Sequence, residues 1–242
     1  MRPYLLPIIQ ECIDRNGVEV YIEPFVGGAN MIDHIRCRKR IGSDINSELI
    51  ELLSYMRDNP DLAIFPDECS REHYAEVREA RKKRTGAYSI PYTAGIGYFA
   101  SYGGRYFDGG YGRNSKERGS VYAERLRHAK IQSHLLKDIK FDAVPYDHYM
   151  SGEYRHCVFY LDPPYRGTKT YAGKHEFDYE KFYAFCRKMA RDNFVFISEY
   201  DMPEDFKVLW EKERKVFQKS NRNKADFATE RLFTFDSQKT YS

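Results

Sequence analysis

Cys157-Val158-Phe159-Tyr160-Leu161-Asp162-Pro163-Pro164-Tyr165 is the stretch that decides the fold. Its apolar run predicts a buried β-strand, and Asp-Pro-Pro-Tyr follows at the carboxyl end, where open α/β sheets bind their ligands. The two prolines lack N–H donors, so the Asp162 carboxylate and the Pro163 carbonyl remain as acceptors beside an aromatic ring. Such a site can hold an amino group by its hydrogens. Taken alone, the segment fits a strand ending in a capping Asp equally well.

The segments on either side alternate between strand and helix patterns. Strands are expected over 18–23, 40–42, 139–144, 157–161, 194–198, 206–210 and 231–235. Helices are expected over 5–13, 29–36, 49–56, 121–137 and 178–191. This alternation predicts a largely parallel, doubly wound α/β sheet.

Size and composition indicate a single globular core with an insertion. The chain has 242 residues, 42% of them hydrophobic, and a mean hydropathy of −0.71. It contains no apolar run of about 18 residues, and charge comes too early for a signal peptide, so a cytoplasmic protein is expected. The five cysteines show no zinc-binding spacing and are expected to be reduced packing residues.

Residues 70–119 interrupt the alternation and are expected to form an inserted lobe rich in loops and also containing helices, with 1–69 and 120–242 as the core. Residues 88–122 contain seven Tyr, two Phe and eight Gly. Residues 71–140 carry 15 Lys/Arg against 7 Asp/Glu, which favours a polyanionic partner such as nucleic acid. The basic run 81–84 is by itself more typical of a solvated helical face. The candidate DNA-binding residues are Tyr102, Arg105, Tyr106, Arg113, Lys116 and Arg118, as stacking rings and as contacts to phosphates or guanine.

A glycine turn after the first strand and an acid after the second indicate a nucleoside-containing cofactor. Gly27 and Gly28 allow a ligand close to the backbone, and Asp44 can accept hydrogen bonds from a ribose diol. The chain lacks a full GxGxxG and a phosphate-binding GxxxxGK[ST] loop, so the signal is weak alone and ATP is disfavoured. Combined with an acid that holds an amine, it suggests group transfer to an amine.

Four motifs occur in a fixed order: Glu23-Pro24-Phe25-Val26-Gly27-Gly28, Ser43-Asp44-Ile45-Asn46, Asp162-Pro163-Pro164-Tyr165 and Phe196-Ile197-Ser198-Glu199-Tyr200. With the basic insertion between the second and third, they resemble the DNA adenine methyltransferases of the Dam-like group, particularly phage-type members. The resemblance covers nearly the whole chain. It implies a Rossmann-like methyltransferase fold with a target-recognition lobe, S-adenosylmethionine as donor, and adenine in double-stranded DNA as acceptor.

The resemblance also implies roles for single residues. Asp162, Pro163, Pro164 and Tyr165 would form the catalytic motif. Cofactor contacts would come from Arg2, Glu23, Pro24, Phe25, Gly27, Gly28, Asp44 and Asp162. Two departures stand out: Ala29 and Asn30 follow the glycines where the family usually has Gly and Ser, and Arg2 stands at a position usually held by Lys.

The expected chemistry is positioning and electrostatic stabilisation. If Asp162 and the Pro163 carbonyl accept the two amine hydrogens, the lone pair of the nitrogen points at the methyl group, and no metal is needed. The target base must leave the duplex, and Tyr165 is the ring expected to stack on it. A methyltransferase acting on the cytosine amino group or on RNA, and a catalytically silent DNA-binding relative, remain alternatives at this stage.

Overall fold

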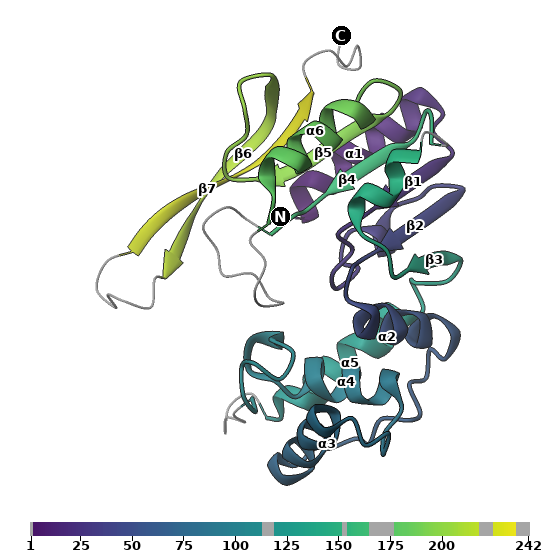
Figure 1. Cartoon of the computed structure of the whole chain (residues 1–242), viewed down its shortest axis with the longest axis vertical. Helices are drawn as coiled ribbons and strands as arrows, with labels where there is room; N and C mark the ends of the chain where they lie inside the picture. Colours follow the sequence, from purple (N-terminus) through teal and green to yellow (C-terminus); the bar gives the residue numbers. More distant parts are fainter. Residues whose placement is uncertain (1, 113–118, 152–153, 165–176, 218–224, 236–242) are drawn as a thin grey trace. The chain divides into compact units, whose positions relative to one another are not determined.

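The first unit of the protein is built on six neighbouring strands (Figure 1). The computed structural model describes residues 2–112, 119–151, 154–164, 177–217 and 225–235. Their contacts divide the chain into a first unit, residues 1–26, 30–43 and 144–242, and a second unit, residues 27–29 and 44–143. Each is described by itself below.

Strand order in the first unit is β2-β1-β4-β5-β7-β6. The first four strands, β2 (Lys39–Ser43), β1 (Val20–Glu23), β4 (Val158–Leu161) and β5 (Phe194–Glu199), are parallel neighbours. Strands β7 (Ala225–Phe235) and β6 (Phe206–Phe217) continue the sheet as an antiparallel pair. Every residue of β4 is buried, as expected for a central parallel strand. The prediction of a largely parallel α/β sheet is confirmed.

Helices supply the rest of the first unit. They are α1 (Arg2–Asn16) and α6 (Tyr179–Met189), with short 3₁₀ turns η1 (Ile32–His34) and η3 (Tyr146–Ser151). Asp178 caps α6 by accepting from the Lys181 N–H at 2.9 Å. The apolar face of α6 packs on one face of the sheet, through Phe182, Phe185, Cys186 and Met189 against Ile22, Phe159 and Ile197.

The second unit is mainly helical. It contains α2 (Ser47–Asp58), α3 (Arg71–Lys83), α4 (Ile90–Phe99), η2 (Tyr102–Gly104), α5 (Val121–Ser133) and strand β3 (Ile139–Asp142). This unit is larger than the predicted lobe over 70–119, because α2 and α5 pack with α4, and β3 packs with α2. That lobe's functional boundaries stay a prediction.

One sequence prediction was wrong. The helix expected over 29–36 is replaced by turns and η1, and Ala29 adopts a left-handed φ of 55°, which ends any helical path at its start. Residues 90–99, to which no element was assigned from the sequence, form helix α4. This helix is buried on most of its circumference and so shows no polar–apolar period. A Cβ at Gly95 would lie 2.2 Å from the Phe65 ring, so this glycine permits a ring to pack against the helix.

All five cysteines are free, and four are buried, consistent with packing residues. Among the residues that the structure describes, no helix is long and apolar enough to cross a membrane.

Candidate active site

The Asp-Pro-Pro segment leaves the carboxyl end of β4 as predicted. Asp162 is exposed, whereas the following Pro163 is buried. The Pro164 carbonyl accepts a hydrogen bond from the Tyr179 hydroxyl at 2.8 Å, which ties the segment to the start of α6. The exit therefore presents a solvent-accessible carboxylate on an anchored backbone. Tyr165 lies outside the described residues.

A buried polar cluster lies on the sheet face opposite α6, below this exit. We define it as Tyr21, Glu23, Tyr160 and Ser198. The Tyr21 hydroxyl donates to Glu23 Oε2 at 3.1 Å, and the hydroxyls of Tyr160 and Ser198 lie 2.8 Å apart. Burial raises the pKa of Glu23 well above its usual range, and the charges of Asp162 and Asp33 add to this, against hydrogen bonds from Tyr21 and the Ile32 backbone. The structure thus brings together Glu23 and Asp162, both predicted as site residues.

The segment after β1 is held by packing and by its backbone. Pro24 is buried, and the Phe25 ring stacks on Tyr146 at a centroid distance of 5.3 Å, with Phe182 edge-on at 5.9 Å. The Val26 N–H donates to the Ser43 carbonyl at 2.9 Å. Phe25 therefore packs in an aromatic cluster, and only the part of its side chain that stays exposed can contact a ligand.

Arg2 contacts the segment that follows the glycine turn. Its Nη1 donates to the Asn30 carbonyl at 3.3 Å and lies 4.0 Å from Asp33 Oδ1. Asp33 Oδ1 also lies 2.7 Å from His34 Nδ1. In this arrangement Arg2 orders residues 30–34.

Gly27, Gly28 and Asp44 meet in the second unit. Asp44 Oδ2 accepts from the Gly27 N–H at 3.4 Å, and Oδ1 accepts from the Asn46 N–H at 2.9 Å. Burial raises the pKa of Asp44, while hydrogen bonds from the Asn46, Gly27 and Ile45 backbone oppose the shift. Gly27 has a left-handed φ of 46°, and the Gly28 carbonyl accepts from Gln132 Nε2 at 2.9 Å. The glycine turn and Asp44, both expected to contact the cofactor, are thus joined by a hydrogen bond.

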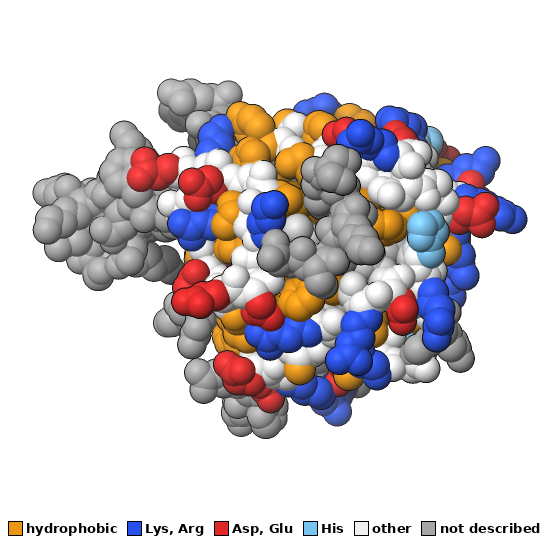
Figure 2. All heavy atoms as spheres, turned by 90° about the horizontal axis from the view of Figure 1, so that it is seen from above, with side chains coloured by type: hydrophobic (Ala, Val, Ile, Leu, Met, Phe, Trp, Pro, Cys, Tyr) orange, Lys and Arg blue, Asp and Glu red, His pale blue; other side chains and the backbone are white. Residues whose placement is uncertain are grey.

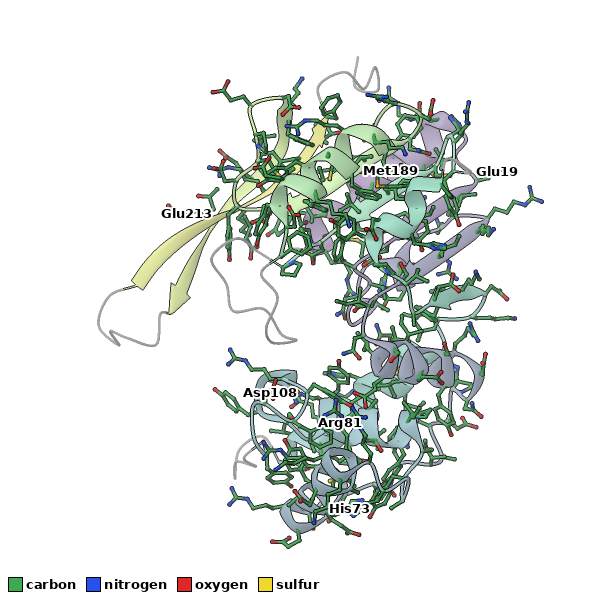
Figure 3. The ribbon with its side chains drawn as sticks, viewed as in Figure 1. Glu19, His73, Arg81, Asp108, Met189 and Glu213 are labelled. Carbon is green, nitrogen blue, oxygen red and sulfur yellow. The ribbon has the colours of Figure 1, made fainter. Side chains whose placement is uncertain are left out.

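A chain of side chains connects the Asp44 loop to the basic helix α3 within the second unit. Asn46 Nδ2 donates to the Tyr98 hydroxyl at 3.0 Å, and Tyr98 stacks on Tyr106 at 4.7 Å. The Tyr106 hydroxyl donates to Glu48 Oε2 at 2.8 Å, and Arg81 Nη2 lies 2.6 Å from the same oxygen. Figure 3 labels Arg81 among the side chains of the second unit. The Arg81 guanidinium also covers the Tyr106 ring at 4.7 Å.

The sequence reasoning did not single out Glu48 or Tyr98. It assigned Arg81 to a solvated helical face. In the structure, Arg81 instead contacts the Glu48 carboxylate and the Tyr106 ring. Another missed residue is Arg125, which donates to the carbonyls of Tyr98, Phe99 and Ser101 and so satisfies the end of α4. The contacting residues Glu48 and Arg81, and Tyr98 and Arg125, are far apart in the sequence. The sequence signals for the Glu48–Arg81 contact were an acid in the first turn of α2 and a basic run at the end of α3.

The predicted DNA-binding residues are placed unequally. Tyr102 is 66% exposed and Arg105 is exposed on the same turn, so both can reach a partner. Tyr106 uses its ring and hydroxyl within the second unit. Arg113, Lys116 and Arg118 lie outside the described residues. On the described part of the face in Figure 2, Lys and Arg side chains are interspersed with Asp and Glu.

Comparison with known proteins identifies a family and a relative. The family model described as D12 class N6 adenine-specific DNA methyltransferase matches residues 4–225. A Type II methyltransferase, M1.LlaDCHI of Lactococcus lactis subsp. cremoris, is 30% identical over 178 residues. That match covers 66% of this chain and 61% of the relative, so the chain spans about three fifths of that protein's length.

Proposed function

Because the chain belongs to the family of D12 class N6 adenine-specific DNA methyltransferases, we propose that it transfers a methyl group from S-adenosylmethionine to the 6-amino group of adenine in DNA. The observation that carries the proposal is the exposed Asp162 carboxylate at the end of the buried strand β4, followed by the buried Pro163. The Asp162 carboxylate supplies a hydrogen-bond acceptor for an amine at the carboxyl edge of the sheet, where α/β enzymes bind ligands.

The residues present fit a nucleoside cofactor. The two Asp44 carboxylate oxygens accept hydrogen bonds from the backbone of Gly27, Ile45 and Asn46. They offer about four lone-pair sites, so the carboxylate can also accept a ribose hydroxyl. Gly27 and the exposed Gly28 leave room for a ligand close to the backbone. Phe25, which is partly exposed, is the proposed contact from the first unit. Glu23 and Pro24 are buried, and Arg2 orders the segment that follows the glycine turn. When bound, S-adenosylmethionine supplies an electrophilic methyl group.

The chain's own residues act on the adenine amine. The Asp162 carboxylate and the Pro163 carbonyl accept its two hydrogens, which turns the nitrogen lone pair away from the purine ring. Asp162 also stabilises the positive charge that develops on this nitrogen. Access to the amine needs a base turned out of the duplex, with Tyr165 as the proposed stacking partner. Tyr102 and Arg105 are proposed DNA contacts from the second unit.

Two substitutions test the proposal because they should fail in different ways. Asp44→Ala should weaken cofactor binding, with partial recovery of rate at high cofactor concentration. Asp162→Ala should lower the transfer rate by on the order of a hundredfold or more, and saturating cofactor should not restore it. Asp192→Ala, at an exposed acid preceding β5, is the matched control and should transfer normally.

The measurement is single-turnover methylation of an adenine-containing duplex with labelled S-adenosylmethionine, followed by nucleoside mass spectrometry. Label on N6-methyladenine supports the proposal. Label on cytosine, no transfer by the wild-type protein, or near-normal transfer by Asp162→Ala would overturn it.

A further inference from the structure

Strand register gathers four buried polar side chains on one face of the sheet. Side chains alternate along a strand, so Tyr21 and Glu23 of β1 share a face, as do Tyr160 of β4 and Ser198 of β5. Ile22, Phe159 and Ile197 face α6 on the opposite side. The four cluster residues are each no more than 3% exposed. They form a polar layer closed off from solvent.

Glu23 receives hydrogen bonds in this layer but lies among acids. The Tyr21 hydroxyl donates to it at 3.1 Å, and the Ile32 backbone also hydrogen-bonds to it. The titratable groups facing it are Tyr21 on its own strand, Asp33 from η1, and Asp162 and Tyr160 from β4 and its exit. Among the residues that the structure describes, the basic groups Arg2 and His34 contact Asp33.

An ionised carboxylate at this position would be buried beside two further acids. Burying a charge without an opposite charge is strongly unfavourable, and a carboxyl group in such surroundings keeps its proton. Tyr21 can still donate to the carbonyl oxygen of the protonated acid. Asp162, by contrast, is exposed and can be stabilised by water in its ionised form.

We propose that Glu23 is a positioning residue that acts in its protonated form, so that the polar layer under the end of β4 is uncharged and Asp162 carries the negative charge directed at the substrate amine. This inference rests on the proposed function for its link to Asp162. The protonation of Glu23 itself is a property of the folded protein alone and can be measured without DNA or cofactor.

The sign of the linked stability change follows from proton binding. The unfolded chain releases the Glu23 proton near pH 4.3, about the ordinary value for Glu, whereas the folded protein retains it to higher pH. Between these limits the folded state binds more protons, so its stability falls as pH rises. Glu23→Gln imitates the protonated acid and removes this proton linkage.

The first experiment compares unfolding midpoints of wild-type protein and Glu23→Gln from pH 5 to pH 8. The midpoint of Glu23→Gln should rise relative to wild type throughout this range. Glu48→Gln is the matched control, since Glu48 is paired with Arg81, and its difference from wild type should stay flat. A flat difference for Glu23→Gln would overturn the proposal.

Infrared spectroscopy of the folded protein at neutral pH provides a second readout. A carbonyl band of a protonated carboxylic acid should be present in wild type and lost in Glu23→Gln. A band of ionised carboxylate lost in its place would overturn the proposal. If Glu23→Gln does not fold, the same band followed in wild type labelled with ¹³C-glutamate, in pH titration, decides the protonation state.

The link to catalysis is tested by the pH profile of the single-turnover methylation rate. Removing an uncharged neighbour should leave the acid-side midpoint of this rate profile in place in Glu23→Gln. If Glu23 were ionised, its replacement would remove a like charge and lower that midpoint, by on the order of one pH unit. Such a shift would overturn the positioning role, whereas absence of methylation in wild type would instead contradict the proposed function.

Discussion

Glu23 and Glu48 are two glutamates, one in each unit, whose surroundings shift the pKa in opposite directions. The pKa of Glu23 is raised and that of Glu48 is lowered. Glu23 is 3% exposed and lies among acids and tyrosines. The Glu48 side chain is 30% exposed and contacts Arg81 and Tyr106. Burial acts to raise the pKa of Glu48, but hydrogen bonds from Arg81 and Tyr106 and the charge of Arg81 together lower it.

The difference shows that the same side chain can serve as a neutral hydrogen-bonding group or as a fixed anion. In the first unit, the proposed protonation makes Glu23 neutral, and the exposed Asp162 carries the negative charge. In the second unit, Glu48 holds Arg81 against the Tyr106 ring and so connects α2, α3 and the turn that carries Arg105. Within the described parts of the chain, Glu48 lies beside a cation and is partly exposed to water, whereas Glu23 is buried beside acids and tyrosines.

The largest expected contrast is between the two alanine substitutions. Glu23→Ala should destabilise the protein by about 2–5 kcal/mol, because it leaves a cavity and an unpartnered Tyr21 hydroxyl in the interior. Glu48→Ala should cost only about 1 kcal/mol, since water can reach the groups it leaves behind. Urea unfolding curves measure both. Equal losses would show that burial does not separate the two sites.

A smaller effect is expected for Tyr106→Phe. This change removes the hydroxyl that donates to Glu48 but retains the ring that stacks on Tyr98, so it should cost about 0.5–1.5 kcal/mol. Tyr102→Phe, at a ring that is 66% exposed, is the control and should change stability by less than about 0.5 kcal/mol. Thermal or urea unfolding measures the loss of stability in both variants. Equal losses would contradict an internal role for the Tyr106 hydroxyl.

The smallest effect is the acid dependence of the Glu48 contact. A carboxyl with a lowered pKa stabilises the fold above its unfolded pKa, near 4.3, and this contribution is lost as pH falls through the lower folded value. The margin of wild type over Glu48→Gln should be at most about 1 kcal/mol, because the pair is partly exposed, and should shrink below pH 4. A margin that persists at pH 3 in urea unfolding would argue against the ion pair.

The strand ends and their acids could be predicted from local pattern alone. The run before Asp162 is apolar throughout because β4 is buried on both faces, and the glycine turn and Asp44 follow their strands directly. Helix α4 could not be predicted in this way. It is apolar on nearly all sides, and its glycines are explained only by rings that pack against them, such as Phe65 on Gly95.

The Tyr-rich segment shows the same limit. Its composition suggested rings free to stack on bases, yet Tyr98 and Tyr106 stack on each other, and the buried Tyr122 donates its hydroxyl hydrogen to the Pro66 carbonyl. Tyr102 differs from them only in its position on an exposed turn. Composition cannot distinguish these cases, because an aromatic side chain serves equally well in a core and on a surface.

The sequence by itself determined the order of the strands along the chain, the acids that follow them and the family to which they belong, since these depend on neighbouring residues. Only the tertiary structure decided which acids can be ionised and which rings are exposed. Glu48 meets Arg81 across 33 residues, and Glu23 comes near Asp162 only because β1 and β4 pair in the sheet. Electrostatic interactions depend on distance in space and on burial, and neither is written in the local sequence.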